Sequence, residues 1–281
     1  MGLAVLLAGG LALGKKPKKP PPPPPLVGQS FDYRYDGKAE GHPERSWLGR
    51  VFVHDKAAGQ KGLPVLVFLH GTNADKIKYR WMGGGNEGDV RRIASELMEE
   101  GAIPPLIVAA PSSIDPLTMV NAMASWPAFD LDAFLDRTEA ALGGPGVLDR
   151  GRVIVAAHSG GGCNIHGGLA TAMHAKVTPV LAGLSIDTCM DTELAKELAN
   201  AAAVSHVVVT WQDLSWKTRP FDAFKIVWKR ELAKAPPVFP GVLREVVYEN
   251  PREPMPHDAM VKLALRKWLP RILPPAPAKA P

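Results

Sequence analysis

The sequence predicts an α/β protein in which a doubly wound, mostly parallel sheet of about eight strands carries helices on both faces. The main observation is an alternation along the chain: short apolar runs of strand length are followed by segments whose apolar residues recur at helical spacing. The second observation is size, because 281 residues with 46% hydrophobic content can bury a sizeable core. Ligands of such sheets bind at the carboxyl ends of the strands, so candidate chemistry is sought there.

The expected strands are runs rich in valine, leucine and isoleucine. Such residues favour strands, and a run that is apolar throughout fits a parallel strand that is buried on both faces. The run at 153–157 is of this kind and stops at a Ser-Gly-Gly sequence. In chain order, the strands are expected at 47–53, 63–71, 105–113, 153–157, 178–187, 205–213 and 243–250.

The expected helices separate these strands. The segment 87–101 has apolar residues at helical spacing and ends on a glycine, and the amphipathic segment 129–144 is stopped by two glycines. The same spacing recurs three more times before the chain ends. The helices are therefore expected at 87–101, 129–144, 191–202, 221–234 and 257–269.

The two ends of the chain do not resemble domain material. Residues 1–14 contain an apolar run that is too short to span a bilayer but has the length of a signal-peptide apolar region. Residues 15–25 predict a stiff Lys/Pro-rich linker, 26–270 the folded domain, and 271–281 a Pro/Ala-rich tail. We therefore expect a secreted, periplasmic or cell-envelope protein with no membrane span after processing, or a cytoplasmic one if the first segment is not a signal.

The formal net charge of +5 does not indicate a nucleic-acid partner. Four of the five units come from Lys15, Lys16, Lys18 and Lys19, all in the expected linker. The domain itself is nearly neutral, so the sequence predicts no phosphate-binding face. The oligomeric state is left open.

The stretch VIVAAHSGGG, residues 153–162, predicts a strand that ends in a sharp turn and displays Ser159. Such a nucleophile turn needs small residues two positions before and after the serine, because the strand and the next helix pass close together there. Ala157 and Gly161 are both small, although glycine is usual at the first position. The alternative is a buried strand followed by a glycine-rich turn without chemistry.

Other expected strands end in the groups that an activated serine needs. The backbone N–H groups of Thr72, which follows a His-Gly pair, and of Gly160 could stabilise an oxyanion. Of the eight histidines, His257 is the candidate base, because it lies on a loop after the last strand. Two carboxylates compete to orient it: Asp213 after the penultimate strand, which is favoured, and Asp187 at the end of the strand before it.

These segments together carry a family resemblance. HGT, AHSGG, TWQD and PHD occur in that order, each after an expected strand, and from about Tyr33 to Leu269 the chain resembles the α/β-hydrolase fold. The resemblance implies an eight-stranded sheet and a serine triad in the chain order Ser, Asp, His. Ala157 departs from the usual pattern, which puts the strain of the turn in doubt but not the nucleophile.

The resemblance implies a serine hydrolase of the carboxylesterase kind that acts on a small-molecule acyl substrate. His257 would take the proton of Ser159, and the serine would attack an ester or amide carbonyl to form an acyl-enzyme. No cofactor or metal is implied, because Cys163 and His166 are too few ligands for a metal site. The alternatives are an inactive hydrolase-fold binding module and an acyltransferase.

Substrate identity is weakly encoded. The segment 111–129, with Trp126, could line an acyl pocket or form a partial flap, and Trp81, Trp211 and Trp216 could join it. Trp126 and Trp211 are the candidate substrate-binding residues. The alternative is that these aromatic side chains belong to the core.

The two cysteines, Cys163 and Cys189, each follow a strand that supplies candidate site residues. Those strands should be neighbours, so a disulfide is sterically conceivable, and export would permit it. The alternative is a pair of buried free thiols.

Overall fold

The structure is a computed structural model that describes residues 24–36, 46–73, 88–112, 121–127, 129–201, 204–215, 218–234, 236, 241–251 and 255–275. The signal-like segment, all of the expected linker but its last two residues, Trp81 and Trp216 lie outside these ranges, as does the tail beyond 275. Within the described ranges, none of the helices has the length and hydropathy needed to cross a bilayer.

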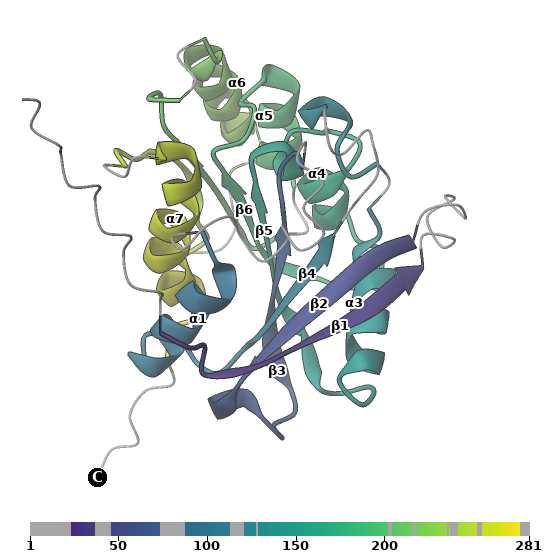
Figure 1. Cartoon of the computed structure of the whole chain (residues 1–281). Helices are drawn as coiled ribbons and strands as arrows, with labels where there is room; N and C mark the ends of the chain where they lie inside the picture. The colour runs from purple at the N-terminus through teal and green to yellow at the C-terminus, as the bar shows by residue number, and fades with distance from the viewer. Residues whose placement is uncertain are drawn as a thin grey trace, which may run out of the picture.

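A sheet of eight strands in the order β1-β2-β4-β3-β5-β6-β7-β8 forms the middle layer (Figure 1). β2 pairs antiparallel with β1 and β4, and every other pair is parallel. The expected mostly parallel sheet is therefore confirmed. The strands are β1 Gly28–Asp36, β2 Ser46–His54, β3 Leu63–Leu69, β4 Ile107–Ser112, β5 Leu148–His158, β6 Val180–Ile186, β7 His206–Trp211 and β8 Arg244–Tyr248.

β1 is the one strand without a counterpart among the expected segments. Its sequence GQSFDYRYD is mainly polar, and it lies at the edge of the sheet, where it pairs only with β2. An edge strand with largely exposed side chains needs little apolar pattern, so this segment carries no strand signal in the sequence.

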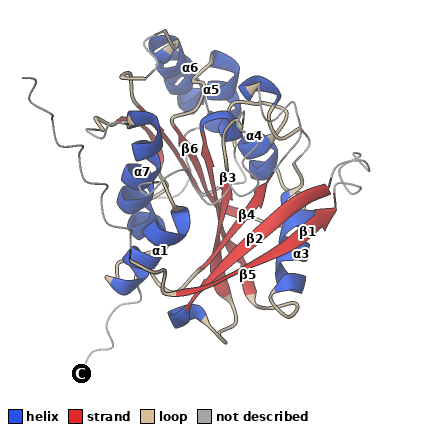
Figure 2. Cartoon of the chain, in the orientation of Figure 1, coloured by secondary structure: helices blue, strands red, loops and turns tan. Residues whose placement is uncertain are grey.

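Helices cover both faces of the sheet, as Figure 2 shows with α1 and α7 on one side and α3 on the other. The side chains of α1 and α7 belong to one hydrophobic cluster, and those of α3, α4, α5 and α6 to the other. The doubly wound architecture is thus confirmed. The helices are α1 Val90–Glu99, α3 Leu131–Ala141, α4 Gly168–Met173, α5 Thr192–Ala199, α6 Phe221–Lys234 and α7 Pro256–Ile272.

Strand β3 illustrates why the central strands are apolar throughout. Val65, Val67 and Leu69 are buried in the cluster of α3 to α6, whereas Leu66 and Phe68 are buried in the cluster of α1 and α7. Successive side chains point to opposite faces of a strand, so a strand between two helical layers has no polar face.

The parallel order also decides where loops meet. β3, β5, β6 and β7 are consecutive neighbours in the sheet and run in the same direction. The segments that follow these strands therefore meet at the carboxyl ends of the strands. They are residues 70–73, 159–162, 187–190 and 212–215.

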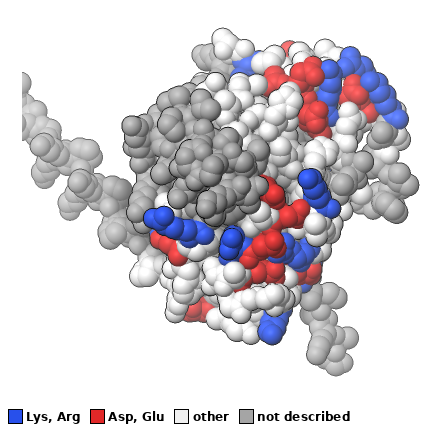
Figure 3. Space-filling view, turned by 90° about the vertical axis from the view of Figure 1, so that its right-hand side faces the viewer, with Lys and Arg blue, Asp and Glu red and all other residues white. Residues whose placement is uncertain are grey.

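The face of the molecule in Figure 3 carries basic and acidic side chains close to one another on its described part. Ion pairs of this kind include Arg150 with Asp136 and Glu139, at N–O distances of 2.6 and 2.7 Å. The absence of a nucleic-acid partner stays a prediction.

Candidate active site

Ser159 stands in a tight turn directly after β5. β5 ends at His158, and a single 3-10 turn, Ser159–Gly162, follows at once. The φ angle of Ser159 is 54°, in the left-handed region that residues other than glycine rarely adopt. Strain of this kind clusters at functional sites, and here it lifts the serine off the end of its strand.

Close approach of the backbone explains the small residues around Ser159. A Cβ atom on Gly161 would lie 2.5 Å from the carbonyl oxygen of Leu69, at the end of the neighbouring strand β3. A Cβ atom on Gly71 would lie 2.7 Å from the Cβ of Ser159 and 3.0 Å from its Oγ. The segment after β3 therefore runs directly beside the serine hydroxyl.

Thr72 and Gly160 lie together, as the sequence predicts for an oxyanion-binding pair. A Cβ atom on Gly160 would be 3.1 Å from the backbone nitrogen of Thr72 and 3.1 Å from the Oγ of Ser125. This arrangement places two backbone segments that can each offer an N–H group next to Ser159.

The loop that carries Thr72 is fixed by buried neighbours. The indole Nε1 of Trp126 donates a hydrogen bond of 2.8 Å to the carbonyl oxygen of His70, and the two rings lie 4.8 Å apart. Nδ1 of the buried His70 lies 2.6 Å from the carbonyl oxygen of Gly71. The buried side chains of Trp126 and His70 therefore hold the loop after β3 in place.

His257 lies in the first turn of α7 and pairs with Asp187. Its Nδ1 donates a hydrogen bond of 2.5 Å to Oδ2 of Asp187, which directly follows β6. The side chain of Asp187 has no exposed surface, and that of His257 is 22% exposed. A histidine that donates from Nδ1 has Nε2 available as a base.

The structure therefore favours the rival acid over the expected one. Asp213, preferred from the sequence, instead accepts a hydrogen bond of 2.9 Å from the hydroxyl of Tyr248 at the end of β8. β6 adjoins the strand of Ser159, whereas Asp213 follows β7, one strand farther from it. Asp187 has a φ of 49°, and its N–H donates to the carbonyl oxygen of Thr210 at 2.8 Å. These contacts fix the carboxylate directly after its strand.

His158 supports the histidine loop rather than the serine. Its Nε2 donates a hydrogen bond of 2.9 Å to the backbone carbonyl oxygen of His257, and the two rings lie 4.4 Å apart. His158 directly precedes the serine in the chain, and the structure places its side chain against His257. Its contribution to holding α7 was not foreseen.

The expected substrate-binding role of Trp126 does not fit the structure. Trp126 is completely buried, packs against Phe129 and has a φ of 53°, so it supports the β3 loop and presents no surface to a substrate. Trp211 is partly exposed, stacks on Phe221 at 4.2 Å and meets Tyr248 edge-on at 4.9 Å. These contacts leave its substrate role a prediction.

A disulfide joins Cys163 to Cys189 across the strand ends. Cys163 lies four residues after Ser159, with its Sγ 3.3 Å from the carbonyl oxygen of that serine, and Cys189 lies two residues after Asp187. The bridge considered from the sequence is therefore present. It links the segment of the candidate nucleophile to that of the candidate acid.

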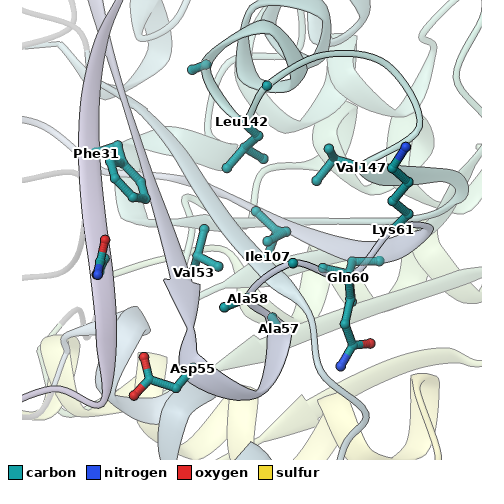
Figure 4. Close-up of a pocket in the computed structure, with 15 residues that line it drawn as sticks. Phe31, Val53, Asp55, Ala57, Ala58, Gln60, Lys61, Ile107, Leu142 and Val147 are labelled. Carbon is teal, nitrogen blue, oxygen red and sulfur yellow. The ribbon is translucent and has the colours of Figure 1, made fainter.

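The described residues contain no group of three or more His, Cys, Asp or Glu side chains that could hold a metal ion. A cavity of about 470 Å³ lies elsewhere, at the opposite ends of the parallel strands, where Phe31, Val53, Ile107, Leu142 and Val147 line it (Figure 4). It is remote from Ser159 and plays no part in the chemistry considered below.

Known proteins resemble this one in structure but not in sequence. No protein-family model and no curated protein sequence matches the chain. Among solved structures, a ferulic acid esterase covers 88% of this chain and 98% of its own, with a TM-score of 0.58 and 16% identity. The BES protein from Bacillus cereus covers 91% and 99%, with a TM-score of 0.55 and 14% identity.

The Enterobactin and Salmochelin Hydrolase IroE covers 89% of this chain and 96% of its own, with a TM-score of 0.50 and 14% identity. Together with the strand order and the turn at Ser159, this likeness decides the architecture. The chain has the α/β-hydrolase fold. Identity of this order shows the α/β-hydrolase fold alone, so the chemistry of the site must be argued from its own geometry.

The identity of the acid can be tested by comparing Asp187→Asn with Asp213→Asn. We expect Asp187→Asn to lower turnover of an ester by about 10⁴, because the wrong tautomer of the histidine is then held. Asp213→Asn should leave turnover within a few-fold, because its partner is Tyr248. Turnover is counted per folded molecule, since Asp187→Asn also removes buried contacts. A dead, folded Asp213→Asn beside an active Asp187→Asn would contradict the assignment.

The disulfide predicts a stability difference. Replacing Cys163 and Cys189 together by alanine should lower the free energy of unfolding by about 2–4 kcal/mol, because the bridge restricts the unfolded chain. Urea unfolding of the oxidised protein and of the double variant measures this. Two alkylatable thiols in unreduced protein would show that the bridge does not form.

Proposed function

We propose that the protein is a serine hydrolase that cleaves carboxylic esters through an acyl-enzyme, with Ser159 as nucleophile, His257 as base and Asp187 as the acid that orients it. The observation that carries the proposal is the Nδ1–Oδ2 hydrogen bond between His257 and Asp187, at the end of the strand that adjoins the strand of Ser159, a serine held at positive φ. A histidine that is oriented by a buried carboxylate at the strand ends can act as the base that activates a serine.

The proposed mechanism follows from that pairing. Asp187 holds the proton of His257 on Nδ1, so Nε2 accepts the proton of Ser159 as its Oγ attacks the ester carbonyl carbon. The N–H groups of Thr72 and Gly160 stabilise the oxyanion, and the protonated His257 then gives its proton to the departing alcohol. Water, deprotonated by the same histidine, attacks the acyl-enzyme and releases the acid, which returns Ser159 to its starting state.

Esters are the first substrate class to test. The names of the structural neighbours describe a ferulic acid esterase and an Enterobactin and Salmochelin Hydrolase, and the first of these names specifies an ester. Both statements concern those proteins and support the ester class for this chain only by analogy of fold.

An oxidising compartment is the proposed location. The disulfide between Cys163 and Cys189 supports it, because structural disulfides persist mainly in exported proteins. The signal-like segment at 1–14 agrees with that location.

Covalent labelling tests the nucleophile. A fluorophosphonate should label the wild-type protein at Ser159, and Ser159→Ala should abolish labelling and lower turnover of chromogenic esters by roughly 10⁴ or more. Ser205→Ala is the matched control, because Ser205 is an exposed serine just before β7 and should leave both unchanged. Labelling that persists in Ser159→Ala would refute the assignment, and an unreactive wild type would favour a binding module.

A further inference from the structure

An arginine lies against the carboxylate of Asp187, and the proposed mechanism does not use it. Arg219, two residues before α6, donates from Nη1 to Oδ1 of Asp187 at 3.0 Å and to the backbone carbonyl oxygen of the same residue at 3.2 Å. The side chain of Arg219 is only 13% exposed. A nearly buried cation therefore touches the carboxylate at Oδ1, the oxygen that does not bond to the histidine.

The two oxygens of Asp187 divide their partners between them. Oδ2 accepts from Nδ1 of His257 and, at 2.7 Å, from Nε2 of Gln212, whereas Oδ1 accepts from Arg219. The three donors come from α7, from the loop after β7 and from the segment before α6. Partners on three sides prevent the carboxylate from rotating, so Oδ2 stays directed at the histidine.

The carboxylate also bears on the charge of the arginine. Burial lowers the pKa of Arg219, and the neighbouring carboxylate of Asp187 partly offsets this. A hydrogen bond between two charged groups is stronger than one between neutral groups, so this contact holds the carboxylate of Asp187 firmly.

We propose that Arg219 is a positioning residue of the active site, which fixes the carboxylate of Asp187 so that Oδ2 stays directed at Nδ1 of His257. The inference rests on the proposed serine hydrolase function. It assigns to the segment before α6 a part in the reaction, which Arg219 plays through Asp187.

Other charged or titratable groups among the described residues also lie near the pair. His158 contacts His257 from β5, and Asp258 follows it in the first turn of α7. Gln212 is neutral, and the hydroxyls of Ser185 and Thr188, near the end of β6, bond to each other at 2.7 Å. Of these groups, Arg219 brings a full positive charge into contact with the carboxylate of Asp187, so its replacement tests the proposal directly.

The experiment compares Arg219→Met, Arg219→Lys and Arg219→Gln in the full chain, with active sites counted by fluorophosphonate labelling. For Arg219→Met we expect kcat to fall about 10–100-fold with KM nearly unchanged, since a misdirected acid impairs the chemical step. Arg219→Lys keeps a charged donor and should restore most of kcat, whereas the neutral Arg219→Gln should restore less of it.

A matched control separates this role from a merely structural one. Arg152→Met removes an arginine that pairs with Asp149 on the surface and should leave kcat and KM unchanged. A lower melting temperature for Arg219→Met, with unchanged kcat per labelled site, would overturn the inference. If Arg219→Met does not fold, equal kcat per labelled site in Arg219→Lys and Arg219→Gln overturns it. Failure of the wild type to react with the probe would instead refute the proposed function.

Discussion

The hydrogen bond between Nδ1 of His257 and Oδ2 of Asp187 is the interaction on which the proposed chemistry depends. It joins the first turn of α7 to the end of β6, two places 70 residues apart in the chain. The bond can form because β5, β6 and β7 are consecutive parallel strands, so the segments that follow them meet at the same end of the sheet. The sheet thus determines which loops meet, and the hydrogen bond determines what those loops can do.

Several contacts restrain the segments that meet there. The serine turn is fixed by the close approach of Gly161 to Leu69, and the β3 loop by the buried indole of Trp126. The disulfide from Cys163 to Cys189 links the turn to the acid segment. A site whose members lie on strand ends and are cross-linked behind the reacting atoms is preorganised, which is what stabilisation of an oxyanion requires.

The sequence was informative where local pattern determines structure. The apolar runs predicted the central strands, and the Ser-Gly-Gly turn predicted the position of Ser159. The strain of that turn, which Ala157 had put in doubt, is present as a φ of 54° at Ser159. The sequence favoured Asp213 over Asp187 and the structure favours Asp187, because the choice depends on which way each loop turns after its strand. A φ of 49° at Asp187 and the hydrogen bond from Tyr248 to Asp213 are tertiary outcomes with no local signature.

The same limit explains the other differences. Trp126 lies in a loop after an expected strand, and packing against His70 and Phe129 makes it a core residue. Arg219 gave no sequence signal, because a lone arginine before a helix is usually a solvated residue. Its contact with Asp187, 32 positions earlier in the chain, is a tertiary outcome.

The most direct test of the account is a double-mutant cycle on the rate at which a fluorophosphonate reacts with Ser159, using Asp187→Asn, His257→Ala and the two combined. If the acid acts only through the histidine, Asp187→Asn should slow the reaction greatly in the wild-type background and by less than about threefold when His257 is already alanine. Two effects that multiply, with Asp187→Asn equally damaging in both backgrounds, would contradict the claim that this pair works as one unit.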